Sequence, residues 1–316
     1  MALWFGEDGP GGIGFVKMQG AGNDYVYVDC FEQEVRNPQA FARRVSSRHY
    51  GIGSDGVILV KPSKRADCFM DMYNADGSRG KACGNGLRCV AKLMYEKLGR
   101  RKKTVSVETL SGIRQCSIEM YSGQKAWVTA QMGPAMFSDV RVPLGEIYGL
   151  LPEDIRLAGA QLVDVGNPHC VLWLEEKTAA DGAGQFLEQL DIKPIGRFLE
   201  NYPGFAQSVN VEFCTGMGCE MLLCDDGCFR PAVRARVWER GTGETLACGS
   251  GACAVFAARP LPKSQEAYVT NSNGDDRNAC WESCCIFMPG GRLCVEQAQQ
   301  SLMLSGEAVT VFRGII

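Results

Sequence analysis

Histidine is scarce in this chain, since His49 and His169 are the only two among 316 residues. A catalytic or metal centre built from several imidazoles is therefore excluded. Basic residues are not in excess, because 33 Lys and Arg stand against 36 Asp and Glu, for a net charge of −3. Nucleic-acid binding depends on a basic surface, so this balance argues against such a partner.

Long apolar segments are missing as well. No stretch holds the roughly 18 consecutive apolar residues that read as a membrane-spanning helix. Residues 1–14 lack the charged-then-apolar order of a secretory signal and the Arg-rich composition of a transit peptide. We therefore expect a cytoplasmic protein that binds neither membrane nor nucleic acid.

Cysteine, by contrast, is abundant, with 16 residues. Without an export signal we expect these to be reduced thiols rather than disulfides. Two groups of four cysteines lie in the second half of the chain. The cysteines within each group are spaced differently from the C-x2-C pairs of zinc sites, so we expect no bound metal. A thiol-rich redox sensor or metal-binding module remains the non-enzymatic alternative. The two groups are Cys214, Cys219, Cys224 and Cys228, and Cys280, Cys284, Cys285 and Cys294.

The length favours two domains, and many short strands with one central helix per half predict an α+β duplication. Gly133 and Pro134 form the expected hinge. A strand at 161–165 is expected to break at 166–169 and to resume at 170–174, and residues 181–200 read as one helix. The other expected helices cover 39–47, 87–98 and 252–258. The other expected strands cover 15–18, 25–29, 57–60, 68–73, 104–109, 113–120, 126–132, 209–213, 233–238, 284–288, 293–296, 302–304 and 308–312.

One short motif occurs twice, as Ala-Cys-Gly-Asn-Gly at 82–86 and Ala-Cys-Gly-Ser-Gly at 247–251, each before a helical stretch. A helix start lowers the pKa of a thiol and binds carboxylates. Cys83 and Cys248 are therefore predicted to lie on opposite sides of a cleft, where one removes the α-proton of an amino acid and the other returns one. They could also form a disulfide in an oxidised, inactive state. Six other cysteines read as small core residues: Cys30, Cys68, Cys89, Cys116, Cys170 and Cys253.

Taken together, the motifs resemble the diaminopimelate epimerases from Val16 to about Phe312. Each piece is weak alone, but their order along the chain is specific. The pieces are Met-Gln-Gly-Ala-Gly-Asn-Asp at 18–24, Gly-Ile-Gly-Ser-Asp-Gly at 51–56, Tyr-Asn-Ala-Asp-Gly-Ser at 73–78, the first cysteine motif, Val-Gly-Asn-Pro-His at 165–169, Asn-Val-Glu-Phe at 210–213, and Trp-Glu-Arg-Gly at 238–241 leading into the second cysteine motif.

The resemblance implies two pseudo-symmetric domains, each a curled, mostly antiparallel sheet wrapped around a central helix. The last strand would return to the first domain, so that residues 1–133 with about 300–316 carry Cys83 and residues 134–299 carry Cys248. It implies a cofactor-independent isomerase that interconverts LL- and meso-diaminopimelate, for lysine and peptidoglycan precursors. A racemase of another amino acid, such as histidine or proline, is the alternative, and a homodimer stays open. A pyridoxal-dependent racemase is disfavoured, because no lysine lies in a recognisable cofactor context.

The resemblance also implies roles for individual residues. Cys83 and Cys248 would exchange the parts of thiolate base and thiol acid, with His169 and Glu239 assisting ionisation. The reacting α-carboxylate and amine would meet backbone groups of Gly84, Asn85, Gly249 and Ser250, the last standing where Thr is common. The distal end of the substrate would be bound by Asn23, Asn74, Asn167, Asn210 and Arg240, with Glu239 holding its ammonium. Residues 214–232 and 261–283 look like an insertion and an irregular stretch.

Overall fold

The computed structural model describes residues 12–80, 83–177, 185–216, 221–224, 229–259 and 283–316. The chain divides into two compact units, the first made of residues 1–131 and 305–316 and the second of residues 132–304. Within the described ranges, none of the helices combines the length and the apolar character needed to cross a bilayer.

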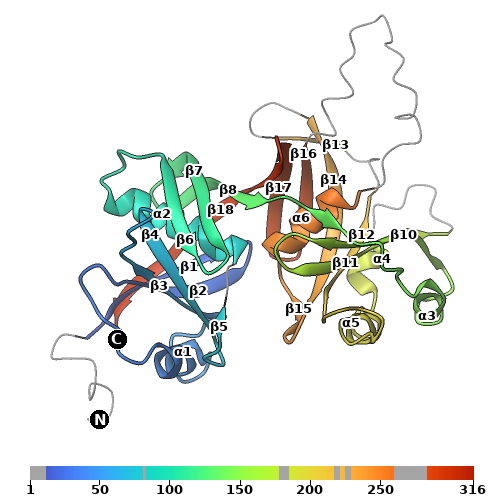
Figure 1. Ribbon diagram of the computed structural model, residues 1–316, viewed down its shortest axis with the longest axis horizontal. Coiled ribbons are helices and arrows are strands. Elements are labelled where there is room, and N and C mark those ends of the chain that lie inside the picture. Colours follow the sequence, from blue (N-terminus) through green and yellow to red (C-terminus); the bar gives the residue numbers. More distant parts are fainter. Residues whose placement is uncertain (1–11, 81–82, 178–184, 217–220, 225–228, 260–282) are drawn as a thin grey trace, which may run out of the picture. The chain divides into compact units, whose positions relative to one another are not determined.

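The first unit is a curled sheet with one helix on its inner face and one on its outer face (Figure 1). The β1–β2, β3–β4 and β6–β7 pairs are antiparallel, and the β2–β3 and β4–β6 pairs are parallel. The last strand of the chain pairs with β1 and β8. The elements are β1 (Gly14–Gly20), β2 (Asn23–Asp29), α1 (Pro38–Ser46), β3 (Gly56–Lys61), β4 (Cys68–Asn74), β5 (Arg79–Gly80), α2 (Gly84–Lys97), β6 (Thr104–Thr109), β7 (Gly112–Ser122), β8 (Lys125–Gly133) and β18 (Ser301–Ile315).

The second unit repeats this pairing order strand for strand. β10–β11, β12–β14 and β16–β17 are antiparallel, and β11–β12 and β14–β16 are parallel. Its elements are β9 (Met136–Phe137), α3 (Leu144–Tyr148), β10 (Ile155–Asp164), β11 (Pro168–Glu176), α4 (Phe186–Gln189), α5 (Lys193–Glu200), β12 (Asn210–Thr215), β13 (Met221–Leu223), β14 (Phe229–Glu239), β15 (Gly243–Thr245), α6 (Gly249–Ala257), β16 (Ser283–Met288) and β17 (Gly291–Ala298). The predicted α+β duplication is therefore confirmed.

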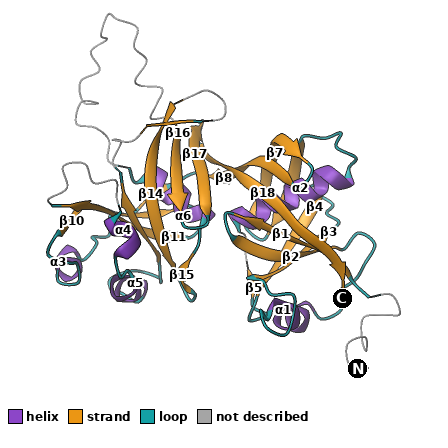
Figure 2. Ribbon diagram, turned by 180° about the vertical axis from the view of Figure 1, so that it is seen from behind, coloured by secondary structure: helices purple, strands orange, loops and turns teal. Residues whose placement is uncertain are grey.

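Each unit buries one helix against the concave side of its own sheet, as both ribbon views show (Figures 1 and 2). Helix α2 packs on β1, β2, β4, β6 and β7, and helix α6 packs on β10, β11, β12, β16 and β17. Almost every residue of α2 is buried, including the charged Arg88 and Lys92. Lys92 is tied to Glu96 and to the Thr310 hydroxyl at 2.7 Å, as a buried charge requires.

The second face of each sheet is covered by peripheral helices, and strand alternation decides which residues meet which helix. In β3, Val57 and Leu59 belong to the core cluster under α1. In β12, Val211 and Phe213 belong to the cluster under α3, α4 and α5. Because successive strand residues point to opposite faces, the residues between them face the central helices α2 and α6.

Three details differ from the sequence-based expectations. The segment 161–174 does not resume one strand, because β10 and β11 fold back on each other as a hairpin around Gly166, which has a φ of 102°. The helix expected over 181–200 is two short helices, since Leu190 is extended and Pro194 opens α5; residues 181–184 lie outside the described ranges. The strands expected at 302–304 and 308–312 are one strand, β18.

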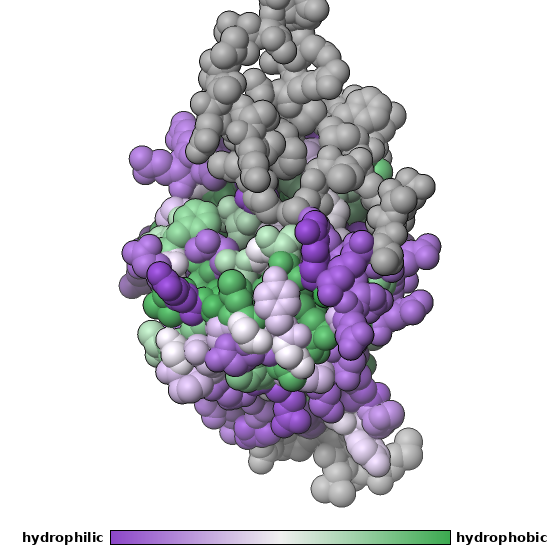
Figure 3. Space-filling view, turned by 90° about the vertical axis from the view of Figure 1, so that its right-hand side faces the viewer, coloured by the Kyte–Doolittle hydropathy of each residue, from purple (hydrophilic) through white to green (hydrophobic). Residues whose placement is uncertain are grey.

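Among the described helices, α3 is the one that the sequence did not predict, because α1, α4 and α5 fall in or next to the ranges expected to be helical at 39–47 and 181–200. Figure 3 shows the side of the second unit on which hydrophobic residues lie in the middle and hydrophilic residues surround them. Leu144, Tyr148 and Leu150, in and after α3, are large side chains of this unit that remain exposed.

The two segments that looked irregular are only partly described. Of residues 214–232, the structure describes the end of β12, strand β13 and the start of β14, which pairs with β13 as a hairpin. Of residues 261–283, only Ser283 is described, as the first residue of β16. Cys219, Cys228 and Cys280 lie outside the described residues.

Candidate active site

Cys83 is the N-cap of the first central helix. It has extended backbone angles, φ −140° and ψ 120°, and its Sγ accepts a hydrogen bond from the Gly86 N–H at 3.4 Å. The thiol thus occupies the place that a Ser or Thr hydroxyl takes in an ordinary cap. Gly84 and Asn85, expected to hold the α-carboxylate, are the first two residues of α2, where N–H groups precede the intrahelical hydrogen-bond ladder.

Asn23 binds the Cys83 thiol with a defined amide orientation. Its Nδ2 donates to Asp55 Oδ2 at 2.7 Å, so its Oδ1 is turned toward Cys83 and accepts from the thiol at 3.3 Å. Asp55 is in turn bound by Arg48, at 2.8 Å. Asn23, which the resemblance assigns to the distal end of the substrate, therefore also contacts the candidate catalytic atom.

Cys248 caps the second central helix in the same way. Its φ is −122° and its ψ is 119°, and its Sγ accepts from the Gly251 N–H at 3.3 Å. The Ser250 hydroxyl lies 3.3 Å from the same sulfur, and the Cys248 N–H donates to Met288 Sδ at 3.4 Å. Gly249 and Ser250 open α6 as Gly84 and Asn85 open α2. The duplicated motif thus gives a duplicated local structure.

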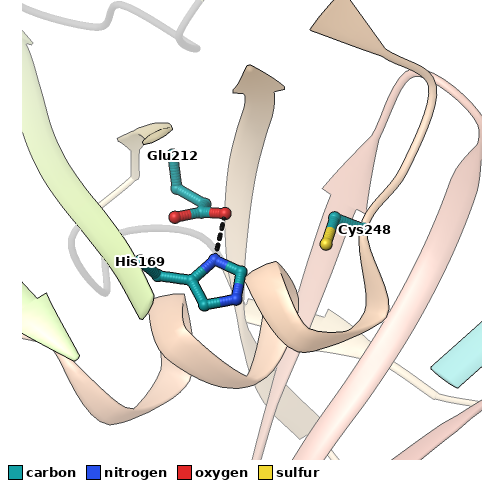
Figure 4. Close-up of side chains that lie close together, drawn as sticks. All are labelled: His169, Glu212 and Cys248. Atoms are coloured by element: carbon teal, nitrogen blue, oxygen red, sulfur yellow. Dashed lines mark hydrogen bonds and ion pairs between the residues drawn. The ribbon is translucent and has the colours of Figure 1, made fainter. Parts of the chain in front are cut away.

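The surroundings of Cys248 differ from those of Cys83, because a histidine and a carboxylate lie beside it. His169 Nδ1 is 2.7 Å from Glu212 Oε1, and both side chains are 0% exposed. Figure 4 shows the Cys248 sulfur pointing toward this pair from the start of α6. One ligating atom of each residue lies within 4.8 Å of those of the other two.

The tautomer of His169 follows from its neighbours. The Arg240 N–H donates to Asn210 Oδ1 at 2.9 Å, which turns Asn210 Nδ2 toward His169 Nε2, at 3.5 Å. Since the amide donates, Nε2 accepts, and Nδ1 carries the proton that it donates to Glu212. Asn210 and Glu212 thus hold the imidazole ring from both sides.

Burial overrides the helix start at Cys248. We expected the amide groups of α6 to lower its pKa, but the pKa is raised well above the ordinary thiol value. Burial is the largest cause, and the negative charges of Glu239 and Glu212 add to it, while the Ser250 and Gly251 hydrogen bonds oppose it. Cys248 is therefore a neutral thiol in this structure, suited to donating a proton.

Glu212 stands where the first unit has an aliphatic side chain. Ile58 and Glu212 are the third residues of the matching strands β3 and β12. A Cβ on Gly86 would lie 2.7 Å from Ile58 Cδ1, and a Cβ on Gly251 would lie 2.6 Å from Glu212 Oε1. Glycine at the third helical position therefore admits the strand side chain in both units, and only in the second is that side chain charged.

The remaining predicted residues lie at strand ends. Asn74 ends β4 and donates to the Ser78 hydroxyl at 2.9 Å, while Asn167 lies half-buried in the β10–β11 turn, where its carbonyl accepts from the Val165 N–H. The Asn85 side chain is buried and accepts from Arg88 at 2.9 Å.

In the second unit, Glu239 ends β14 and accepts a hydrogen bond from the Thr245 hydroxyl. The exposed Arg240 donates through Nη1 to the Ser208 carbonyl at 3.1 Å. After burial, the negative charge of Glu239 is the next cause that raises the pKa of Cys248.

Sequence reasoning missed Glu212 as a site residue, although the motif that contains it had been recognised. The available signal was its spacing from Asn210, because residues two apart in a strand share a face. One oxygen of Glu212, Oε2, is buried and has no hydrogen-bond partner among the described residues. Imidazole, carboxylate and thiol together could also ligate a divalent cation, and within the described ranges this is the one group of three or more such residues so arranged.

A family model described as diaminopimelate epimerase matches residues 15–138 and 161–309. Curated relatives with that name include one from Methanococcus maripaludis strain C5, 37% identical over 96% of this chain and 99% of its own length. Another, from Acetivibrio thermocellus, is 36% identical over 95% of this chain and 97% of its own length.

Solved structures of lower identity share the fold. A phenazine biosynthesis protein of the PhzF family from Bacillus anthracis aligns with a TM-score of 0.66 at 15% identity, over 96% of this chain and 99% of the other. A probable proline racemase from Agrobacterium radiobacter K84 aligns with a TM-score of 0.55 at 15% identity, over 96% and 92%.

Proposed function

This chain belongs to the diaminopimelate epimerase family, and we propose that it interconverts LL- and meso-diaminopimelate by proton transfer between two thiols and the α-carbon. As an isomerase of this kind it would act on a free amino acid without a cofactor, in the cytoplasm, for lysine and peptidoglycan precursors. The observation that carries the proposal is the pair of identical caps, in which Cys83 and Cys248 each open the central helix of a duplicated fold.

The chemistry requires one thiolate and one thiol at a time. In the direction that starts at Cys83, its thiolate removes the α-proton, and the Cys248 thiol returns a proton to the opposite face of the carbon. The Gly86 N–H that contacts Cys83 Sγ supports the thiolate, and the raised pKa of Cys248 keeps its proton available. In the reverse direction the two residues exchange roles.

The helix starts supply the second requirement, which is stabilisation of the carbanion. As the α-proton leaves, negative charge moves onto the α-carboxylate, and N–H groups at the beginning of a helix favour such charge. Gly84 and Asn85 in α2 and Gly249 and Ser250 in α6 are the residues proposed for this contact. Glycine at the first helical position lets the carboxylate approach the backbone.

The distal end of the substrate needs groups that recognise a second amino-carboxylate. A guanidinium has five N–H donors in a fork that suits a carboxylate. In the exposed Arg240, one of these donors, on Nη1, is bonded to the Ser208 carbonyl. Arg240 with Asn74, Asn167 and Asn210 is proposed to bind the distal carboxylate, and Glu239 to bind the distal ammonium.

The homodimer stays a prediction, for which size-exclusion chromatography with light scattering is the test.

The test is turnover of LL-diaminopimelate, followed by chiral chromatography of the meso product. L-Histidine and L-proline are assayed in parallel for α-proton exchange in deuterated water. We expect epimerisation of diaminopimelate alone. Exchange of another amino acid with none of diaminopimelate would replace the substrate assignment by a racemase on the same scaffold, and no exchange of any would overturn the proposal.

A further inference from the structure

Three thiols of the second unit lie in contact with one another and take no part in the proposed reaction. Cys285 in β16 and Cys294 in β17 are directly opposite residues of an antiparallel pair, and their sulfurs are 2.8 Å apart. Cys224, which follows β13, has its sulfur 3.5 Å from that of Cys285. All three are free thiols in the structure.

The backbone positions of Cys285 and Cys294 suit a disulfide. Opposite residues of an antiparallel pair have Cα atoms about 4.5 or 5.5 Å apart, depending on the hydrogen-bonding type of the pair. Both spacings lie within the range of about 4.4 to 6.8 Å that disulfides span. Joining the two sulfurs therefore requires side-chain rotation and no change of strand register.

The arrangement fits a disulfide better than a metal site. A metal needs its ligating atoms gathered around one point, and within the described residues the only such group is the one at Cys248. Cys224, Cys285 and Cys294 instead form a row with Cys285 in the middle. A row of three thiols allows a disulfide to move from one pair to the next.

Solvent exposure differs among the three thiols of the row. Cys285 is 0% exposed, whereas Cys294 is half-buried. The contact with Cys294, followed by burial, raises the pKa of Cys285. Arg230 hydrogen-bonds the Cys224 thiol, and the charge of Arg292 acts on Cys285. Each cation lowers the pKa of the thiol on which it acts, but burial and, at Cys285, the contact with Cys294 outweigh it, so both pKa values remain raised.

We propose that Cys285 and Cys294 form a reversible disulfide site for low-molecular-weight disulfides of the glutathione type. The Cys294 thiolate attacks one sulfur of the small disulfide and releases the first small thiolate, leaving a mixed disulfide. Cys285 gives its proton to that thiolate and attacks the Cys294 sulfur, which releases the second. Two protein thiols are thereby oxidised, and one small disulfide is reduced to two thiols.

Cys224 is the exchange partner of this pair. From 3.5 Å, its thiolate can attack the Cys285 sulfur, which forms a Cys224–Cys285 disulfide and frees Cys294 as a thiolate. The strands that carry the pair pack on α6, and Met288 at the end of β16 accepts the Cys248 N–H. The site therefore lies on the hairpin that supports the helix of Cys248, without consuming its thiol.

The experiment equilibrates the full-length protein with mixtures of reduced and oxidised glutathione, quenches with acid, alkylates the remaining thiols and maps disulfides by mass spectrometry. The wild-type protein should contain a Cys285–Cys294 peptide pair, carry no glutathione on either of these residues, and recover both thiols with excess dithiothreitol, whatever the state of Cys83 and Cys248. A persistent glutathione adduct at Cys294, or a disulfide of Cys285 with any cysteine outside the row, would overturn the proposal.

Single variants separate the three thiols. Cys294→Ser should give the Cys224–Cys285 disulfide instead, and Cys285→Ser should give neither pair and retain a glutathione adduct on Cys294. Cys116→Ser, a buried cysteine of the first unit, is the matched control and should keep the wild-type pattern. Circular dichroism checks that each variant folds. If Cys285→Ser is unstable, Cys294→Ser still tests the proposal, because Cys294 is only half-buried. The readout is the covalent state, so it is independent of whether the epimerase proposal holds.

Discussion

His169 and Glu212 form a fully buried pair in which Nδ1 donates to Oε1 at 2.7 Å, next to the Cys248 thiol. Asn210 holds the opposite nitrogen of the ring, so the imidazole has one tautomer and one orientation. Burial is the largest cause that raises the pKa of the neighbouring Cys248 thiol, and the negative charges of Glu239 and Glu212 add to it.

Removal of the Glu212 carboxylate tests its orienting role. Glu212→Ile restores the aliphatic side chain found at Ile58 of the first unit, so the fold should persist while His169 loses its acceptor. We expect kcat to fall by roughly 10- to 100-fold, by analogy with the loss of the partner that orients a metal-ligating imidazole. Steady-state kinetics measure this, and Glu175→Gln, at the far end of β11, is the control. Unchanged kcat in Glu212→Ile would show that the pair is structural only.

The charge of Glu212 is tested separately by Glu212→Gln, which keeps the size and an acceptor oxygen. Loss of a negative charge beside Cys248 should lower the pKa of that thiol, because the carboxylate raises it in the wild type. Alkylation of Cys248 by iodoacetamide at pH 8 should therefore be faster in Glu212→Gln, as followed by peptide mass spectrometry. An equal or slower rate would contradict the assigned cause.

The raised pKa of Cys248 also predicts a pH dependence of stability. A thiol whose folded-state pKa lies above its unfolded value contributes stability that is complete below the unfolded pKa, about 8.5, and is lost as pH rises toward the folded pKa. Between pH 8.5 and 9.5 the wild type should lose about 1 kcal/mol more than Cys248→Ser. Urea unfolding of both proteins at the two pH values measures the difference. Parallel losses would contradict a buried neutral thiol.

Gly251 is required by the close approach of Glu212. Gly251→Ala would bring a methyl group within 2.6 Å of Glu212 Oε1, so the carboxylate or the helix must move. We expect the free energy of unfolding to fall by about 1 to 3 kcal/mol. We expect kcat to fall by a larger fraction of its wild-type value than the free energy of unfolding does. Gly145→Ala, in helix α3 with open space around its Cα, is the control and should leave the stability unchanged or raise it. Chemical unfolding and kinetics on the three proteins test this.

Divalent zinc should inhibit the enzyme, because His169, Glu212 and Cys248 present one imidazole, one carboxylate and one thiol within reach of a single cation. Micromolar zinc is expected to block turnover, and EDTA to restore it. EDTA alone should leave the activity of the purified enzyme unchanged. Zinc should inhibit Glu212→Ile less strongly, and equal inhibition of both proteins would place the ion elsewhere.

The duplicated caps could be predicted from sequence because they are local. Cysteine, two glycines and a helical stretch define the geometry at Cys83 and Cys248 within five residues. The positions of most strands followed in outline from turn residues and alternation, whereas the order in which the strands pair was not predicted. The β10–β11 hairpin was not predicted either, because Asn167 and Pro168 are compatible with a bend in one strand as well as with a reversal between two.

What depends on packing could not be predicted. The pKa of Cys248 reverses the expected direction because burial and two carboxylates, brought in from β12 and β14, outweigh its own helix start. Glu212 was missed because nothing within its strand distinguishes a buried carboxylate from a solvent-facing one. The contact between Asn23 and the Cys83 thiol was not predicted either, because the fold brings the start of β2 to the start of α2.

The most direct test of the two-thiol account is α-proton exchange of diaminopimelate in deuterated water, followed by NMR and mass spectrometry, with wild type, Cys83→Ser and Cys248→Ser. The account predicts that the wild type epimerises with incorporation of one solvent deuteron in the inverted product, and that neither variant completes epimerisation. Full epimerisation by either single variant would contradict it.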